Sequence, residues 1–363
     1  MSSLGQRTDL FCRRFQLRVP ILLAPMAGVP APQLSIAVAQ AGALGACGVL
    51  LMSPDEILSW ADAVRGSGPF QLNNWIPDPP PPRDAAHEST VREFLATWGP
   101  PVPPHAGDAR PPDFAPQCEA MLAANPPVVS SVMGLFASEF VRRLKERGIA
   151  WFANITTVAE ARAAEAAGAD VVVAQGMEAG GHRGCFDARE AERRQVGLLA
   201  LLPAVADAVR LPVVATGGIA DARGVAAALL LGASAVQIGT AFLRCPEAGI
   251  HPAWAAALAG TAPEDTIVSR VFSGRAGRSI ATRYVEAATA PQAPQPAPYP
   301  VQRGLTAPMR SAALTTGEVQ RMQAWAGQSA AMARAEPAAR VVERLWDCAR
   351  ELLRAVPVTA GAR

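Results

Sequence analysis

The stretch AWFANITTVAEARAAEAAGADVVVAQ, residues 150–175, has the pattern of a strand, a helix and a second strand in one run. Its two ends, AWFANI and DVVVAQ, are short apolar segments of the kind that form buried parallel strands. Between them, residues 157–167 begin at a threonine and carry an alanine-rich face, which predicts a capped amphipathic helix. The stretch therefore predicts a βα unit and a parallel sheet.

The same alternation extends through the first two thirds of the chain. A comparable helix is expected at residues 221–231, which begin at an aspartate. Eight consecutive units favour an α/β fold of the closed (β/α)8 TIM-barrel type over a doubly wound open sheet. The expected strands are residues 21–26, 44–49, 70–75, 128–133, 150–155, 170–175, 212–216 and 235–239.

Two proline-rich stretches interrupt this alternation. Residues 69–116 contain 13 of the 33 prolines, so we expect an insertion at about 76–116 that forms neither regular helix nor central strand. Residues 291–300 contain five more prolines, which predicts an extended surface crossover.

These interruptions predict three parts of the chain. We expect the barrel to occupy residues 1–243 and a smaller cap-like subdomain, without barrel strands or clean helices, to occupy residues 244–313. Residues 314–363 are expected to return to the barrel as helices at about 316–335 and 338–355.

Composition excludes several functions. The chain has 33 basic and 31 acidic residues, a formal charge of +2, which argues against a nucleic-acid partner. The six cysteines form no C-x-x-C pair, so we expect neither a metal site nor disulfides, and a cytoplasmic location. No apolar run approaches the roughly 20 residues that a membrane span needs. Lys145 is the only lysine, so an anion must be bound by arginine, histidine or backbone N–H groups.

Glycine-rich segments follow three of the expected strands, at the end of the barrel where function is usually located. Gln175–Gly184 contains four glycines and His182. A lone histidine is more often structural than catalytic, but its place in a glycine-rich loop at a strand end favours catalysis. Gly217-Gly218 and Gln237-Ile238-Gly239-Thr240 open toward expected helix starts, where N–H groups attract phosphate. These loops predict a phosphate-bearing cofactor.

Other candidate residues have a structural alternative. Asn73 and Gln175 place amide groups at the barrel mouth, where they suit the polar edge of a flavin ring or simply cap the loop backbone. The segment Ala24–Gly28 suits either a sharp turn against a flat ligand or an ordinary βα turn, and taken alone it favours the ordinary turn. Cys185 has no base apparent beside it, so a buried small hydrophobe is favoured over a nucleophile.

Together these segments resemble the nitronate monooxygenase family, formerly called 2-nitropropane dioxygenases, whose members are FMN-dependent (β/α)8-barrel enzymes. The resemblance covers most of the chain and rests on eight segments. They are Pro20–Gly28, Ala41–Gly45, Pro69–Asn73, Gln175–Gly184, Ala215–Asp221, Gln237–Phe242, Ser273-Gly274-Arg275 with Arg278, and Trp325–Gln328.

The resemblance implies an oxidoreductase that uses O2 to convert alkyl nitronates or nitroalkanes to a carbonyl compound and nitrite. His182 is then expected to be the base. Some relatives line the substrate pocket with several tyrosines, whereas this chain has only Tyr284 and Tyr299. The residues expected to bind FMN are Ala24, Pro25, Met26, Asn73, Gln175, Gly180, Gly181, Gly217, Gly218, Gln237, Ile238, Gly239 and Thr240.

Two other functions fit the same sequence. The first is an FMN-dependent NAD(P)H enoyl or quinone reductase of the same barrel superfamily. The second is a barrel without catalysis that serves as a scaffold, with the proline-rich residues 77–82 and 100–104 as polyproline II ligands. Both a monomer and a homodimer are compatible with the sequence.

Overall fold

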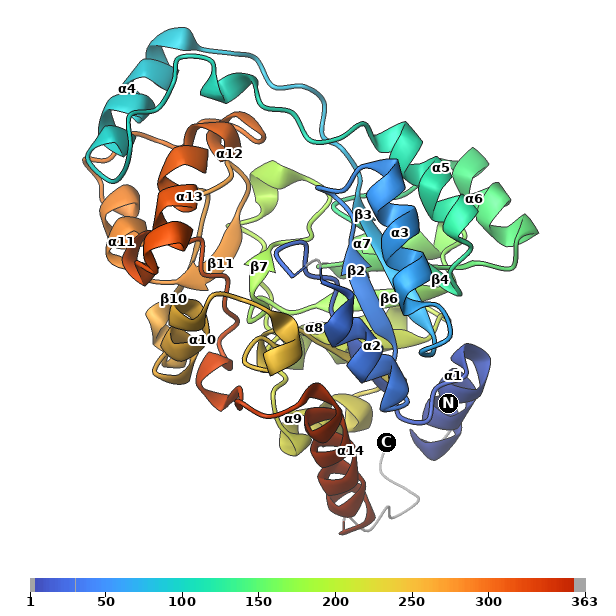
Figure 1. Ribbon diagram of the computed structural model, residues 1–363. Helices are drawn as coiled ribbons and strands as arrows, with labels where there is room; N and C mark the ends of the chain where they lie inside the picture. The colour runs from blue at the N-terminus through green and yellow to red at the C-terminus, as the bar shows by residue number, and fades with distance from the viewer. Residues whose placement is uncertain (1–3, 30, 356–363) are drawn as a thin grey trace.

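Eight parallel strands form the centre of the molecule (Figure 1). The computed structural model describes residues 4–29 and 31–355. The strands lie in the order β1-β9-β8-β6-β5-β4-β3-β2. Two backbone hydrogen bonds close the circle, from Leu23 N to Leu44 O (2.8 Å) and from Leu44 N to Ile21 O (3.0 Å). The predicted TIM barrel is confirmed.

All eight expected strands are present, and the first ends at Leu23 rather than at residue 26. The barrel strands are β1 (Ile21–Leu23), β2 (Gly45–Gly48), β3 (Phe70–Trp75), β4 (Val128–Val132), β5 (Ala150–Ile155), β6 (Val171–Gln175), β8 (Val213–Thr216) and β9 (Ala235–Ile238).

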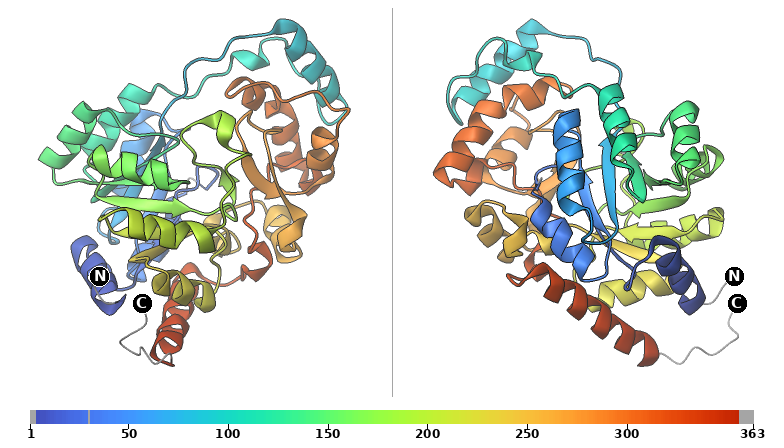
Figure 2. Two further views of the ribbon diagram at one scale, coloured as in Figure 1. Left: turned by 180° about the vertical axis from the view of Figure 1, so that it is seen from behind. Right: turned by 45° about the vertical axis from the view of Figure 1, so that its right-hand side comes forward.

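Helices cover the outside of the barrel (Figure 2). The expected caps are present: Thr157 Oγ1 accepts from Glu160 N (3.1 Å), and Asp221 Oδ1 accepts from Gly224 N (3.0 Å). The predicted C-terminal helix is also confirmed as α14 (Ala338–Ala355), which packs against α9 and α2; residues 356–363 lie outside the described part. The other outer helices are α2 (Pro32–Gln40), α3 (Pro54–Val64), α5 (Phe114–Ala124), α6 (Ser138–Glu146), α7 (Val158–Ala166), α8 (Leu198–Ala208) and α9 (Ala222–Leu230).

One end of the barrel is filled by α1 (Leu4–Phe15). Phe11 and Phe15 are buried there in one apolar cluster with Leu22, Phe152 and other residues near the strand starts. The rings of Phe15 and Phe152 are 5.0 Å apart in an edge-to-face arrangement. Because this end is closed by side chains, the opposite end, where the strands finish, is left for a ligand.

The proline-rich insertion differs from the prediction, because it contains the regular helix α4 (Ala85–Ala96). The prolines lie on either side of this helix, at residues 77–82 and 100–104, and not inside it. Figure 1 shows the insertion arching over the segment that carries α12 and α13. Val91 and Leu95 of α4 are buried in one cluster with Val301 and Leu305 of that segment. The insertion therefore packs against α12 through buried apolar side chains.

Residues 244–313 contain four α-helices, so the prediction that this segment lacks clean helices was wrong. Its strand β11 pairs antiparallel with β10 on one side and with the short β7 (Gly181–His182) on the other, placing Gly277 opposite His182. The elements are α10 (Pro252–Ala259), β10 (Thr266–Ser269), β11 (Gly277–Ile280), α11 (Arg283–Thr289), α12 (Val301–Leu305) and α13 (Ala307–Thr316).

The predicted helix at 316–335 was also wrong. Gly317 has a positive φ of 71° and ends α13, and the residues after it form only the 3-10 turns η6 (Val319–Arg321) and η7 (Ala330–Met332). Between these turns the chain runs beside β11, where Ile280 N donates to Ala324 O (2.9 Å). Pairing with a distant strand therefore overrides the local helix propensity.

Residues 291–300 have no regular structure, as predicted, but they are not wholly at the surface. Ala297 is buried and Tyr299 is half-buried. Across the described residues, no helix combines the length and the apolar character that crossing a bilayer requires.

Candidate active site

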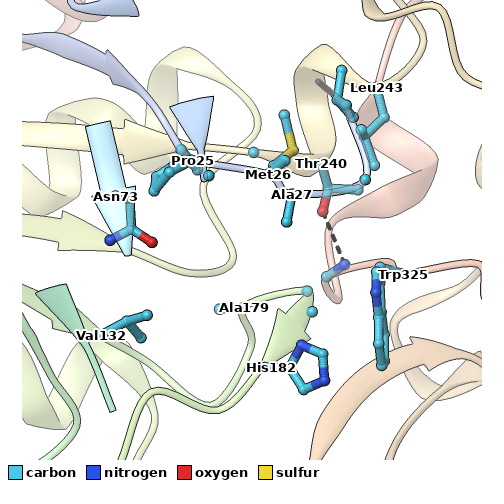
Figure 3. A pocket seen from close by; sticks show the side chains of 18 of the residues that line it. Pro25, Met26, Ala27, Asn73, Val132, Ala179, His182, Thr240, Leu243 and Trp325 are labelled. Atoms are coloured by element: carbon cyan, nitrogen blue, oxygen red, sulfur yellow. Dashed lines mark hydrogen bonds between the residues drawn. The ribbon is translucent and has the colours of Figure 1, made fainter. Parts of the chain in front are cut away.

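A cavity of about 520 Å³ lies at the ends of the barrel strands. Its walls come from the βα loops and from residues 249–254, 299–314 and 322–329. Figure 3 shows Pro25 and Met26 on one side of the cavity and His182 on the other. The structure brings together on this cavity every residue predicted to bind cofactor and the predicted base: Ala24, Pro25, Met26, Asn73, Gln175, Gly180, Gly181, His182, Gly217, Gly218, Gln237, Ile238, Gly239 and Thr240.

The His182 side chain is held from three directions. Its Nε2 lies 2.8 Å from Ser273 Oγ, and its ring contacts Trp75 (4.6 Å between centroids) and Trp325 (4.7 Å). Among the described residues, Nδ1 has no hydrogen-bond partner. Burial lowers the pKa of His182 to about 3, and the charges of Arg275 and Arg303 add to the shift. The imidazole is therefore neutral at pH 7, with one nitrogen available to a ligand.

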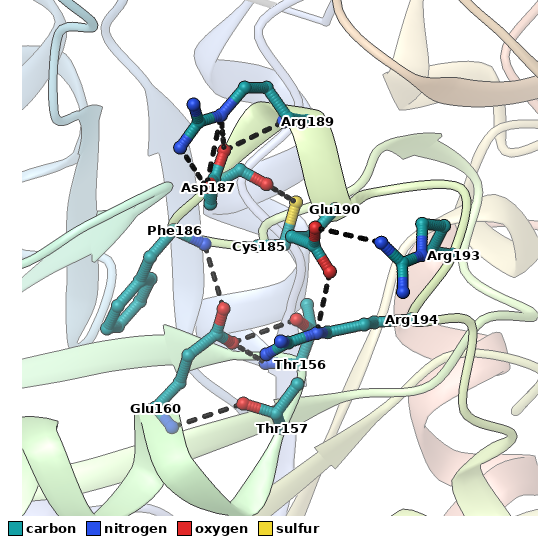
Figure 4. A network of polar contacts seen from close by, with 10 residues as sticks. All are labelled: Thr156, Thr157, Glu160, Cys185, Phe186, Asp187, Arg189, Glu190, Arg193 and Arg194. Atoms are coloured by element: carbon teal, nitrogen blue, oxygen red, sulfur yellow. Dashed lines mark hydrogen bonds and ion pairs between the residues drawn. The ribbon is translucent and has the colours of Figure 1, made fainter.

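The loop that follows His182 is fixed by one carboxylate (Figure 4). Glu160 Oε2 accepts from Thr156 N (2.6 Å) and Thr156 Oγ1 (2.8 Å), while its Oε1 accepts from Phe186 N (2.8 Å). Cys185 lies in this loop with its thiol donating to Asp187 O (3.2 Å), and burial raises its pKa. The favoured interpretation of Cys185 as a buried, unreactive thiol agrees with these contacts.

The amide of Gln175 serves the loop backbone. Its Nε2 donates to His182 O (3.2 Å), and its Oε1 accepts from Gly184 N (2.8 Å). Gln175 therefore positions the segment that carries His182. This is the loop-capping role that was expected as the alternative to contact with a flavin ring.

Asn73 and Gln237 retain free polar atoms at the cavity. Asn73 Nδ2 donates to Ser130 Oγ (3.0 Å), and Gln237 Oε1 accepts from Gln71 Nε2 (3.1 Å). Within the described chain, Asn73 Oδ1 and Gln237 Nε2 make no hydrogen bond, so one acceptor and one donor are available to a ligand.

The two predicted phosphate loops have unsatisfied backbone donors. Within residues 4–29 and 31–355, the N–H groups of Gly217, Gly218 and Gly239 make no hydrogen bond. Gly217 and Gly218 have φ angles of 111° and 70°, a conformation that glycine adopts without strain. A Cβ on Gly239 would meet only Ala24 Cβ (3.3 Å) and Met26 Sδ (3.5 Å), so the glycine keeps cavity space open. These features suit a phosphate group.

The helix starts behind these loops differ from the prediction. The N-terminus of α9 is already capped by the Asp221 carboxylate, and the loop after β9 enters only a three-residue 3-10 turn, η3 (Thr240–Phe242). Loop amides, and not the first turns of two α-helices, are therefore the donors offered to an anion. Thr240 Oγ1 is engaged as an acceptor from Gly327 N (3.0 Å; Figure 3).

Several residues that line the cavity were not predicted as site residues from the sequence. Trp75 ends β3, whereas Ser273, Tyr299 and Trp325 come from segments that only the fold brings to His182. Arg303 and Arg310 of α12 and α13 also line the cavity. The family-like segments around Ser273 and Trp325 were the only signal for two of these residues. Tyr284 is buried away from the cavity, where its hydroxyl donates to Val271 O (3.0 Å).

The chain is similar over most of its length to known proteins. The sequence pattern described as nitronate monooxygenase matches residues 11–347. A nitronate monooxygenase of Paraburkholderia phytofirmans is 40% identical over 336 residues, covering 90% of this chain and 91% of the relative. A nitronate monooxygenase of Pseudomonas aeruginosa is 39% identical over 350 residues, covering 94% and 99%.

Solved structures give the same result. A nitroalkane oxidase from Streptomyces ansochromogenes is similar, with a TM-score of 0.85 and 38% identity over 95% of this chain and 99% of that chain. FabK from Thermotoga maritima is more distant, with a TM-score of 0.74 and 27% identity over 95% and 97%. The chain belongs to the nitronate monooxygenase family, a family of flavin-dependent oxidoreductases.

Proposed function

We propose that this protein binds FMN and oxidises alkyl nitronates with O2 to a carbonyl compound and nitrite. The observation that carries the proposal is the placement of a neutral, aromatic-flanked His182 on the same cavity as three unsatisfied glycine amides. The amides of Gly217, Gly218 and Gly239 are the proposed phosphate ligands. When bound, the flavin supplies the electron transfer between substrate and O2.

The walls of the cavity suit a flat ring with a polar edge. Ala24, Pro25 and Met26 supply apolar atoms, and Asn73 Oδ1 with Gln237 Nε2 supply an acceptor and a donor. No aspartate or glutamate lines the cavity among the described residues, so an anionic phosphate and an anionic nitronate meet no opposing carboxylate there.

His182 acts on the substrate carbon. For a neutral nitroalkane, His182 Nδ1 removes the α proton, since Nε2 is engaged with Ser273. The low pKa of His182 makes it a weak base, which favours substrates that arrive already ionised as nitronates. Trp75, Trp325 and Ser273 hold the ring in place.

The test compares His182→Asn with the parent protein, both loaded with FMN. Oxygen consumption with nitroethane is expected to fall by about 100-fold or more, because general-base catalysis is lost. Turnover of ethyl nitronate, which needs no deprotonation, should fall far less. Equal losses on both substrates would contradict the role of His182 as a base.

A second measurement separates the proposal from a reductase function. FMN-loaded protein is mixed anaerobically with NADPH, NADH or ethyl nitronate, and flavin absorbance is followed. Bleaching by the nitronate alone supports the monooxygenase. Rapid bleaching by a nicotinamide would overturn it in favour of a reductase. Protein that takes up no FMN would point to a scaffold.

A further inference from the structure

A second, smaller cavity of about 40 Å³ lies beside the main cavity described above. It is found where the two ends of the proline-rich insertion come together. Ile76 and Pro77 follow β3, and Pro111 and Pro112 precede α5. A cavity needs roughly 10–15 Å³ to hold one water molecule. The second cavity is therefore large enough for a diatomic gas and far too small for a flavin.

Three half-buried side chains separate the second cavity from the main one. Leu50, Trp75 and Tyr299 line both cavities. The rings of Trp75 and Tyr299 are 5.5 Å apart, and the Trp75 ring is 4.6 Å from the ring of His182. The partition therefore lies beside the imidazole. Rotations of such side chains are fast on the time scale of turnover, so a small molecule can cross it.

The outer wall of the second cavity is apolar and stiff. Pro77, Pro111 and Pro112 have a fixed φ and short ring side chains, so they resist collapse into the space between them. The Phe114 ring also lines this cavity and stacks against Phe136, with 6.3 Å between centroids. This wall keeps a narrow apolar space open.

Most polar side chains on the second cavity are already bonded. Asn74 Nδ2 donates to Gln117 Oε1 (2.9 Å), and Gln117 Nε2 donates to three backbone carbonyls. Arg275 pairs with Asp78. Tyr299 Oη and Arg275 Nε are buried atoms there without a partner in the described chain. A retained water needs about two to four polar partners, so this wall favours an apolar occupant.

Larger ligands have a different entrance. Leu51 and Leu314 line the main cavity and are 39% and 51% exposed, so the main cavity opens to solvent there. The second cavity reaches the surface separately, at the exposed Pro77. A small gas therefore has its own path toward His182, which is available while larger ligands occupy the main cavity.

We propose that the second cavity is the route by which O2 reaches the His182 side of the main cavity. This inference rests on the proposed function, because O2 is the electron acceptor of that reaction. O2 is small, uncharged and apolar, so it enters an apolar passage more readily than water or an anion does. The two ends of the proline-rich insertion form the walls of this passage.

The first test narrows the second cavity. Ile76→Phe enlarges a side chain that lines the second cavity and not the main one. The FMN-loaded variant is compared with the parent on ethyl nitronate at varied O2. We expect kcat/KM for O2 to fall by about 10-fold, because a narrowed path slows association. The value of kcat/KM for ethyl nitronate, which enters through the main cavity, should stay within about twofold of the parent.

Two further variants make the result specific. Leu135→Phe adds bulk at a half-buried position that lines neither cavity, and it should leave both values unchanged. Phe114→Leu shortens a side chain of the second cavity and should raise kcat/KM for O2. An unchanged value for O2 in Ile76→Phe would overturn the proposal, as would an equal loss in Leu135→Phe.

Gas binding is measured separately from turnover. Crystals of the FMN-loaded parent are pressurised with xenon, an apolar atom that occupies dry cavities. Xenon in the second cavity supports the route even if no nitronate is oxidised, an outcome that would refute only the proposed function. A second cavity that holds an ordered water and no xenon would refute the route. Because this measurement uses the parent protein, it does not depend on the folding of Ile76→Phe.

Discussion

His182 Nε2 and Ser273 Oγ lie 2.8 Å apart, although 91 positions separate the two residues in the chain. The Ser273 hydroxyl also contacts the backbone of Arg275, at 3.1 Å from its carbonyl oxygen and 3.3 Å from its nitrogen. A buried turn of the 244–313 segment therefore holds the ring that the barrel loop presents.

The low pKa of His182 predicts a loss of stability in acid. In the unfolded chain the histidine pKa is about 6.5, whereas in the folded protein it is about 3, so between these values the unfolded state binds more protons. The stability that the neutral His182 contributes is fully present above pH 6.5 and is lost as the pH falls toward 3. At pH 5 the free energy of unfolding should therefore be about 2 kcal/mol lower than at pH 7.

Urea unfolding of the flavin-free protein at pH 7 and pH 5 measures this cost. His182→Asn should lose less stability between the two pH values than the parent does. A variant at the exposed His105, His105→Asn, provides the control and should match the parent. An identical acid response in all three proteins would show that His182 titrates normally.

Two glycine variants should separate ligand binding from folding. Gly239→Ala adds a methyl group that the protein atoms can accommodate, so the fold should persist while FMN affinity falls by about 10-fold or more as the cavity narrows. A Cβ on Gly180 would lie 2.5 Å from Gly327 N and 2.7 Å from Ala326 C. Gly180→Ala should therefore destabilise the fold itself.

Thermal unfolding of the flavin-free proteins and fluorescence titration with FMN distinguish the two effects. A Gly239→Ala protein that binds FMN like the parent would remove this loop from the cofactor site. A Gly180→Ala protein with an unchanged unfolding temperature would show that the backbone around Gly327 shifts to accommodate the added methyl group.

Replacing Asp78 should be strongly destabilising. Arg275 is only 2% exposed, and its ion pair with Asp78 is supplemented by a hydrogen bond to Cys185 O (2.8 Å). Asp78→Asn leaves this buried charge uncompensated, which should cost about 3 kcal/mol in the free energy of unfolding at pH 7. Asp62→Asn, which breaks the exposed pair with Arg65, should cost under about 1 kcal/mol. Similar costs for both would argue that Arg275 finds other acceptors.

The packing of the proline-rich insertion predicts a role in supporting α12. Leu95 is 1% exposed and shares a cluster with Val301 and Leu305. Leu95→Ala should cost about 2–5 kcal/mol. Because α12 also carries Arg303, which lines the cavity, the same variant should raise KM for ethyl nitronate. Leu199→Ala, at a position that is 73% exposed, is the matched control. If Leu95→Ala changes stability as little as this control, the insertion does not support α12.

Local sequence was sufficient to predict the barrel and many of the residues that line the cavity. Apolar runs, the caps at Thr157 and Asp221 and the glycine-rich loops are short-range signals, and the carboxyl ends of parallel strands necessarily meet at one edge. Helix α4 was not predicted because the expectation rested on how many prolines the insertion contains. Their positions decide the outcome, since the prolines flank Ala85–Ala96 and leave this stretch free to form a helix. The helix predicted at 316–335 failed because contacts with β11 and with Thr240 determine that segment.

The remaining cavity residues could not be predicted from local patterns. Ser273 reaches His182, and Tyr299 and Arg303 reach the same cavity, only through the path of the 244–313 segment. Neither charge nor composition distinguishes Arg303 from the other arginines. Its distinguishing property is its place on the cavity wall, which depends on the complete arrangement of the fold.

The pairing of β7 with β11 limits how this enzyme can be recombined with its relatives. Gly277 stands opposite His182 and Arg278 opposite Gly181, so residues 244–313 and the His182 loop share one strand register. A chimaera with a foreign 244–313 segment must preserve this register. A shift of one residue would turn Arg278 and Ser279 to the opposite faces of the sheet and misplace His182 with them. The unit to exchange is therefore the loop and the segment together.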